Sequence, residues 1–303
     1  MQEIEAGVGF ERSEQIVFDD RSDVVPTHVR QGNVLDQCPK AHNLAIDPTQ
    51  AGEFTLLTVP GENGKLDLDA VAVVLGQHLD VHSTKVRALS VTQSTESGTV
   101  YAFAELEAIS ALAKKHSLAL HMDGARFANA VASLGCKPRE ITWERGVDVL
   151  CFGGTKNGLA AGEVVVFFQP ELARDFDFRL KQGGQLASKS RFLAAPWSAL
   201  LSDDLWLKNA RHANEMAERL EMKLAKIGLT DLAFPRQANA LFPRLPGETA
   251  KHLQARGWHF YNFFEPGVYR LMCSWATTEE QLDALVADCA AARNQSTVAS
   301  ARE

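Results

Sequence analysis

The sequence predicts an α/β fold with a parallel sheet, because short apolar runs alternate with helical patterns from residue 54 onward. Its length of 303 residues corresponds to about two domains. A hydrophobic content of 46% is enough to form a packed core, which excludes a disordered or fibrous chain. The expected strands are five apolar runs: 54–59, 86–92, 118–122, 147–152 and 164–168.

Helices are expected between these strands and in the last third of the chain. Apolar residues recur at helical spacing in 68–79 and 103–113, and a third helix is expected after Asp123. Ser202 is suited to cap a long helix, and the segment Thr277-Thr278-Glu279-Glu280 opens the last helix with a capping-box pattern. Two short strands are expected between these last helices: 238–242 and 268–274.

These patterns divide the chain into three parts. A large α/β domain, 54–200, is followed by a small α+β domain, 201–303, and the long helix joins them. Residues 1–53 contain scattered charges, three prolines and short apolar islands, so we assign no element to them.

Composition limits the partners and the compartment. Lys and Arg number 31 against 38 Asp and Glu, and the net charge of −7 argues against a general nucleic-acid or membrane-binding surface. The five cysteines are widely spaced without a CxxC pair, which argues against a disulfide framework or a structural metal site. The N-terminus lacks a signal-peptide pattern, and no apolar run approaches the ~18 residues that span a bilayer. We therefore expect a soluble, cytoplasmic protein.

Two segments contain candidate catalytic residues. In His121–Arg126, Asp123 ends a buried strand, at the edge where ligands bind in open α/β sheets. Taken alone, Asp123 is better explained as a helix N-cap, and Arg126 as a solvated side chain. In Gly153–Gly158, Lys156 lies in a glycine-containing loop directly after the next strand, where a mobile surface lysine is the simpler explanation.

The pair is more informative than either segment, because two strand-end loops of one sheet offer a carboxylate and an amine. Pyridoxal phosphate (PLP) chemistry needs this pair. The lysine forms a Schiff base with the cofactor aldehyde, and the aspartate keeps the ring nitrogen protonated so that the ring accepts electrons. It also needs an anion site for the cofactor phosphate and an arginine that orients the substrate carboxylate.

The segments His121–Arg126 and Gly153–Gly158 resemble the low-specificity L-threonine aldolases of the β-eliminating lyase group, which are PLP enzymes of fold type I. The similarity runs from about Leu56 to Cys289 and includes three further segments: 59–66, 185–189 and 269–271. The resemblance implies a fold-type-I PLP-dependent transferase fold, with a large domain of mainly parallel sheet and a smaller C-terminal α+β domain.

The resemblance also implies roles for four charged residues. Lys156 matches the Schiff-base lysine, and Asp123 matches the partner of the pyridinium nitrogen. Arg126 matches an arginine near the cofactor oxygen and the substrate carboxylate. Arg270 matches a second carboxylate-binding arginine, and strand alternation places it opposite the apolar face formed by its neighbours.

Three polar residues complete the implied site. Thr155 and Gln93 are expected to contact the cofactor, and Thr95 the substrate. Several family members carry a histidine where this chain has Thr95, and a hydroxyl cannot replace imidazole as a base near neutral pH. Removal of the substrate hydroxyl proton then falls to another group or to water. His121 shares a strand face with Asp123, but we favour a packed core histidine.

The N-terminal part departs from the family. Its phosphate-binding Gly-Thr/Ala-Asn loop and its ring-stacking histidine are not recognisable in residues 1–53. Two explanations stay open: a coding sequence truncated or read out of frame before residue 54, which we favour, or a degenerate member. Without that loop several charge-assisted hydrogen bonds would be lost, so we expect weak cofactor binding.

We therefore expect a PLP-dependent lyase that cleaves L-threonine or L-allo-threonine to glycine and an aldehyde, and that forms a homo-oligomer, either a dimer or a tetramer. Two alternatives remain. Another fold-type-I lyase or an aminotransferase would use the same Lys156 and Asp123, and an impaired homologue would act only as a scaffold.

Overall fold

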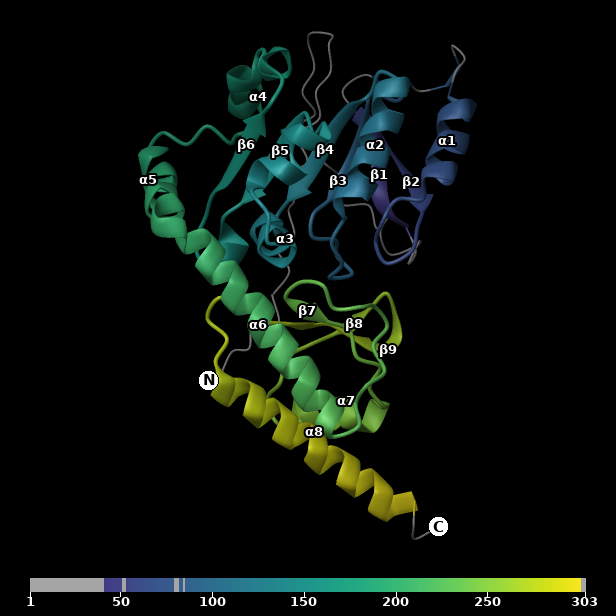
Figure 1. The fold of residues 1–303 in the computed structure, drawn as a ribbon, viewed down its shortest axis with the longest axis vertical. Helices are drawn as coiled ribbons and strands as arrows, with labels where there is room; N and C mark the ends of the chain where they lie inside the picture. Colours follow the sequence, from purple (N-terminus) through teal and green to yellow (C-terminus); the bar gives the residue numbers. More distant parts are fainter. Residues whose placement is uncertain (1–40, 51–52, 79–81, 84, 301–303) are drawn as a thin grey trace.

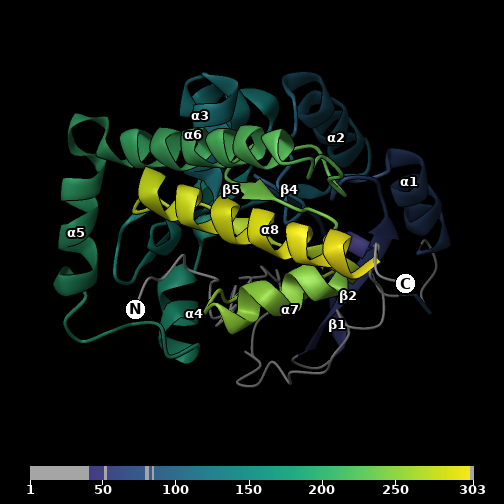
Figure 2. The same ribbon diagram turned by 90° about the horizontal axis from the view of Figure 1, so that it is seen from below.

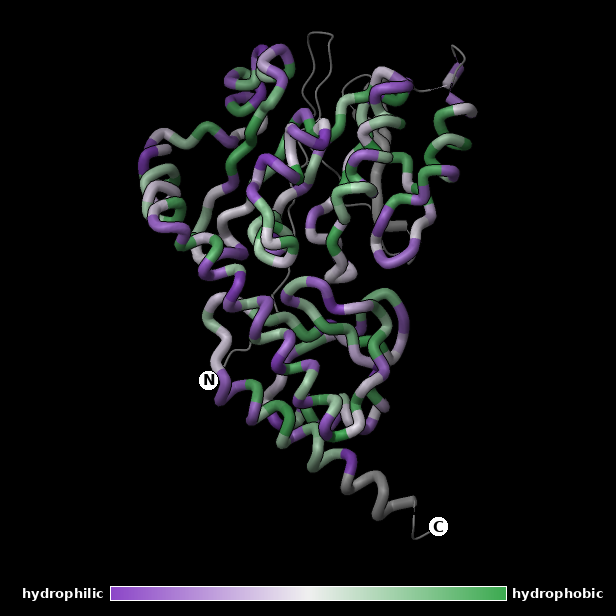
Figure 3. Tube along the Cα trace, in the orientation of Figure 1, coloured by the Kyte–Doolittle hydropathy of each residue, from purple (hydrophilic) through white to green (hydrophobic). Residues whose placement is uncertain are grey.

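The computed structural model describes residues 41–50, 53–78, 82–83 and 85–300, so most of the segment 1–53 lies outside the described residues. An upper part contains the main sheet and helices that pack on it, and a lower part contains short strands and the C-terminal helix (Figure 1). Apolar residues follow the central strands (Figure 3). None of the described helices is long and apolar enough to cross a lipid bilayer.

The main sheet has six strands in the order β2-β1-β3-β4-β5-β6. The three central strands, β3, β4 and β5, are parallel neighbours, whereas β1, β2 and β6 pair antiparallel. All five strands expected from the apolar runs are present, which confirms the α/β fold class. The strands are β1 Ala41–Gln50, β2 Glu53–Pro60, β3 Ala88–Thr92, β4 Ala119–Gly124, β5 Val149–Gly153 and β6 Glu163–Phe167.

Strand β1 is an element that the sequence patterns did not predict, since no element was assigned to residues 1–53. It pairs antiparallel with β2 on one side and with β3 on the other. Its pairing with β2 is irregular between Asp47 and Gln50, where Pro48 has no N–H to donate. A strand that contains a proline, and whose pairing with β3 joins segments about 40 residues apart, has no clear local signature.

The expected helices are confirmed, and the described residues form three more. The expected cap of the long helix is wrong: Ser202 ends helix α5, and the long helix begins at Leu205 with Asp204 at its N-cap. Helices α4, α5 and α7 were not predicted. The α-helices are α1 Leu68–Gln77, α2 Phe103–Lys115, α3 Phe127–Leu134, α4 Phe176–Gln182, α5 Arg191–Leu201, α6 Leu205–Lys226, α7 Gly247–Ala255 and α8 Glu279–Ser300. In the lower part, the two expected short strands pair as β7 Ala240–Leu241 with β10 Leu271–Met272, beside the hairpin of β8 Asn262–Phe263 and β9 Glu265–Tyr269.

Helix α6 connects the two parts of the molecule and contributes to both cores. Near its N-terminus, Trp206 stacks on Phe127 at 6.4 Å between ring centroids and meets Phe152 edge-on at 5.5 Å. Near its C-terminus, Leu220 and Leu224 belong to a separate hydrophobic cluster in the lower part. Seen from below, α8 lies between α6 and α7 (Figure 2). The packing of α6 therefore sets how the two parts meet.

We expect Trp206→Ala to lower the free energy of unfolding by about 3–5 kcal/mol, because it deletes a large buried side chain next to two aromatic rings. Trp206 is 7% exposed, whereas Trp143 is 51% exposed, so Trp143→Ala is the matched control. Urea denaturation measures both variants. Equal losses in the two variants would contradict a structural role for Trp206.

Candidate active site

The parallel pairing of β4 and β5 brings the two motif loops together. Asp123 lies opposite Cys151 in the register of the two strands. Asp123 is the next-to-last residue of β4, and Lys156 follows three residues after the end of β5. Because parallel strands end at the same edge of a sheet, both residues lie at the edge where ligands bind in open α/β sheets.

Lys156 lies in a short 3₁₀ turn, Thr155–Asn157, that is attached to helix α6. The Asn157 side chain is buried, and its Nδ2 donates to the Trp206 carbonyl at 2.9 Å. In return, Asn209 Nδ2 donates to the Asn157 carbonyl at 2.9 Å. Lys156 itself is exposed, and the backbone of its turn is held in place by these two hydrogen bonds.

Gly153 allows three segments to approach one another beside Asp123. A Cβ at Gly153 would lie 2.8 Å from Ala125 Cα and 2.9 Å from Glu163 Oε2, distances that real Cβ atoms do not adopt. On the other side of this contact, Asp123 Oδ1 accepts a hydrogen bond from the Ala125 N–H at 2.9 Å. Position 153 therefore requires a glycine because of the packing of these segments, whether or not a ligand also approaches it.

His121 is held inside the sheet below Asp123. One ring nitrogen lies 2.8 Å from Ser90 Oγ, and the other lies 3.3 Å from Cys151 Sγ. Burial lowers the pKa of His121, and the Asp123 charge opposes that effect. Both ring nitrogens have partners within the core, which supports the interpretation of His121 as a packed histidine.

Glu163, on β6, accepts a hydrogen bond from Thr155 and is affected by the charges of Lys156 and Asp123. Thr155 Oγ1 donates to Glu163 Oε1 at 2.7 Å. Burial raises the pKa of Glu163, the Thr155 hydrogen bond and the charge of Lys156 lower it, and the charge of Asp123 raises it further. The charges of both the predicted amine, Lys156, and the predicted carboxylate, Asp123, therefore act on one carboxylate, that of Glu163.

Glu96 brings the two predicted arginines together. Arg126 Nη1 lies 3.0 Å from Glu96 Oε1, and Arg270 Nη1 lies 3.2 Å from Glu96 Oε2. Arg270 comes from the lower part, where its guanidinium packs over Phe263 at 4.6 Å and Tyr261 at 5.2 Å and also donates to the Tyr261 hydroxyl. The site is thus formed where the two parts of the molecule meet.

Burial alone would raise the pKa of Glu96, but the positive charges of Arg126, Lys156 and Arg270 outweigh burial and lower it to about 2. The positive charge of Lys156 therefore acts on the same carboxylate as the two arginines. Four of the predicted site residues are thus gathered around two acidic groups, Glu96 and Glu163.

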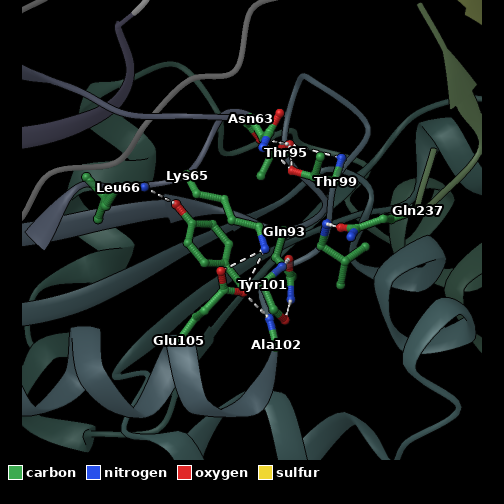
Figure 4. A network of polar contacts seen from close by, with 11 residues as sticks. Asn63, Lys65, Leu66, Gln93, Thr95, Thr99, Tyr101, Ala102, Glu105 and Gln237 are labelled. Carbon is green, nitrogen blue, oxygen red and sulfur yellow. Dashed lines mark hydrogen bonds and ion pairs between the residues drawn. The ribbon is translucent and has the colours of Figure 1, made fainter. Parts of the chain in front are cut away.

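Gln93 and Thr95 use their side chains in a neighbouring polar network (Figure 4). The Gln93 amide donates to the Tyr101 carbonyl at 3.0 Å and accepts from the Tyr101 N–H at 2.9 Å. Thr95 Oγ1 lies 2.7 Å from Thr99 Oγ1, which donates to the Asn63 carbonyl at 2.6 Å. These bonds shape the loop after β3. Ligand contacts for Gln93 and Thr95 stay predictions.

Glu96, Glu163 and Asn157 are residues of the site that the sequence patterns did not single out. Glu96 is the charged residue of the polar segment after β3, a usable but weak signal. Glu163 had no local signal, because its role depends on the antiparallel pairing of β5 with β6, where Glu163 lies opposite Gly153. Asn157 acts through a distant helix, which a local motif cannot reveal.

The donor set of this site fits PLP. An exposed amine and a carboxylate lie on neighbouring strand-end loops, as the aldehyde and the ring nitrogen of the cofactor require. The family's phosphate-binding loop is not recognisable in residues 1–53, most of which lie outside the described residues. Among the described residues, no cluster of three His, Cys, Asp or Glu side chains is arranged to hold a metal ion.

Comparison with known proteins extends these observations. The low specificity L-threonine aldolase of Pseudomonas sp. is 48% identical to this chain over 256 residues, which cover 83% of this chain and 74% of the relative. The protein of the same name from Pseudomonas aeruginosa shows the same identity and coverage.

Solved structures agree with the fold. A threonine aldolase from Leishmania major superposes with a TM-score of 0.72 at 31% identity, covering 77% of this chain and 69% of that one. A probable N-succinyldiaminopimelate aminotransferase from Thermus thermophilus superposes with a TM-score of 0.55 at 20% identity, covering 78% of this chain and 65% of that one, which shows the fold alone.

A family model described as beta-eliminating lyase matches residues 10–244. The match begins at residue 10, upstream of Leu56, where the resemblance was expected to begin. Because this family model matches most of the chain, the chain belongs to the beta-eliminating lyase family.

Proposed function

We propose that this protein is a PLP-dependent aldolase that cleaves β-hydroxy-α-amino acids, such as L-threonine or L-allo-threonine, to glycine and an aldehyde. The observation that carries the proposal is the position of Lys156 and Asp123 at the ends of neighbouring parallel strands. Relatives named low specificity L-threonine aldolase, at 48% identity, support the choice of reaction.

Each charged residue has a separate task in this proposal. The Lys156 amine would hold the cofactor covalently, and the Asp123 carboxylate would keep its ring nitrogen protonated. When bound, PLP supplies an electron sink for the carbanion left at Cα. Thr155 and Gln93 are proposed as further cofactor contacts, and Thr95 as a substrate contact.

Arg126 and Arg270 bind the substrate carboxylate and thereby choose the bond that breaks. They come from different parts of the molecule, yet both reach the same carboxylate, that of Glu96. Two guanidinium groups restrict rotation of a bound carboxylate and so fix the direction of the Cα–Cβ bond. The β-hydroxyl proton leaves to water in this scheme, because His121 is occupied by Ser90 and Cys151.

Two alternatives are tested against this proposal: another lyase or an aminotransferase, which would use the same Lys156 and Asp123, and a scaffold without activity. The products separate these functions. An aldolase releases acetaldehyde and glycine from L-threonine, an aminotransferase releases a keto acid, and a scaffold releases neither.

We expect Lys156→Ala to reduce acetaldehyde release from L-threonine by about 10³-fold or more, since it removes the amine that holds the cofactor. We expect Asp123→Asn to reduce kcat by about 10²-fold or more, since an amide does not stabilise a protonated ring nitrogen. A coupled alcohol dehydrogenase assay measures the aldehyde. Lys115→Ala, an exposed lysine at the end of α2, is the control. Full activity of Lys156→Ala would contradict the proposal.

The proposal includes a cytoplasmic homo-oligomer. Large apolar side chains are exposed between residues 176 and 205, among them Phe178 at 70%, Phe192 at 67% and Leu201 at 49%. Such a concentration of exposed apolar groups is typical of a surface that another subunit covers. Four described cysteines are free, as expected in a reducing compartment.

We expect the double substitution Phe178→Ser and Phe192→Ser to shift the protein toward a smaller species in sedimentation velocity, because both remove exposed apolar area from the proposed interface. Val73→Ser is the control, since Val73 is 61% exposed on helix α1, away from this surface. An unchanged sedimentation coefficient in the double variant would argue that this surface is not an interface.

A further inference from the structure

We propose that Glu96 is an exchangeable counter-ion: in the substrate-free protein its carboxylate fills the anion site between Arg126 and Arg270, and the carboxylate of an incoming amino acid displaces it. The inference rests on the proposed function, because it takes these arginines as the substrate carboxylate site. Under this proposal, Glu96 lowers the affinity for substrate by competing with the substrate carboxylate.

The geometry of the contact is that of a bridging carboxylate. One Glu96 oxygen lies 3.0 Å from Arg126 Nη1, and the other lies 3.2 Å from Arg270 Nη1. A substrate α-carboxylate has the same two oxygens at the same separation. Because Glu96 uses one oxygen for each arginine, a second carboxylate cannot bridge the same two nitrogens while Glu96 stays in place.

The exposed fractions of the three side chains indicate that Glu96, and not an arginine, is the group that moves. The side chains of Arg126 and Arg270 are each 8% exposed, whereas the Glu96 side chain is 33% exposed. Glu96 is therefore more accessible to an anion from solvent than either arginine. Arg270 is also packed on Tyr261 and Phe263, which hold its guanidinium where it is.

The backbone on both sides of Glu96 is anchored, so the exchange requires mainly a side-chain rotation. Gln93 binds the backbone of Tyr101 through both ends of its amide. The Thr95 N–H donates to the Thr99 carbonyl at 2.9 Å. A rotation between staggered rotamers is fast compared with turnover, so the exchange need not limit the rate.

Charge explains why the site is filled at rest. Arg126, Lys156 and Arg270 place three positive charges around one carboxylate, and separating them from any anion would leave like charges facing each other in a partly buried site. Glu96 supplies the missing negative charge until a substrate does. The substrate must therefore compete with Glu96, and its apparent affinity is reduced by the fraction of time that Glu96 occupies the site.

The test compares Glu96→Gln with the wild-type full-length chain. If Glu96 occupies the site nine-tenths of the time, its removal increases anion affinity about tenfold. We expect calorimetric titration to show about tenfold tighter binding of acetate to Glu96→Gln, and absorbance titration of the holoenzyme to show tighter binding of glycine. Equal or weaker acetate binding would overturn the proposal, because it would mean that Glu96 supports the arginines instead of competing for them.

The acetate measurement needs neither turnover nor aldehyde release, so it remains informative if the proposed aldolase activity is absent. Glu221→Gln is the matched control, because Glu221 pairs with Arg236 at 2.6 Å outside the site and should leave acetate affinity unchanged. Should Glu96→Gln fail to fold, Glu96→Asp retains the charge on a shorter side chain that cannot bridge both arginines. Acetate binding to Glu96→Asp that is no tighter than to the wild type would then overturn the proposal.

Discussion

The parallel pairing of β4 with β5 is the constraint on which the site depends. It aligns Asp123 with Cys151 and so places the loop that contains Lys156 beside the end of the neighbouring strand. Neither residue is informative alone, since an aspartate at a strand end caps helices and a loop lysine is usually solvated. The register of the two strands places an aspartate and a lysine where both can contact one cofactor ring.

The site also has to balance its own charges. Arg126, Lys156 and Arg270 act on Glu96, while Lys156 and Asp123 act on Glu163. Positive groups needed for anionic ligands would repel one another if they were gathered without acidic partners. Glu96 and Glu163 therefore offset the positive charges of the unliganded site, which explains their position among the functional groups.

The sequence predicts the central strands, the long helices and the pair of Lys156 and Asp123, because these depend on local periodicity and on short motifs. It does not predict β1, whose existence depends on pairing with β2 and β3. Glu163 escapes prediction for the same reason, since antiparallel pairing places it opposite Gly153. Local patterns thus reveal the chemical groups, and non-local pairing decides which acidic residues accompany them.

Helix α6 links the two halves of the site mechanically. At one end it holds the turn of Lys156 through Asn157 and Asn209. At the other end Leu220 and Leu224 pack in the cluster that contains Tyr269, the residue before Arg270. The position of Lys156 relative to Arg270 therefore depends on how one rigid helix packs in two separate cores. A substitution in either core can change substrate binding without touching a site residue, since a small displacement of a positioning group is costly for catalysis.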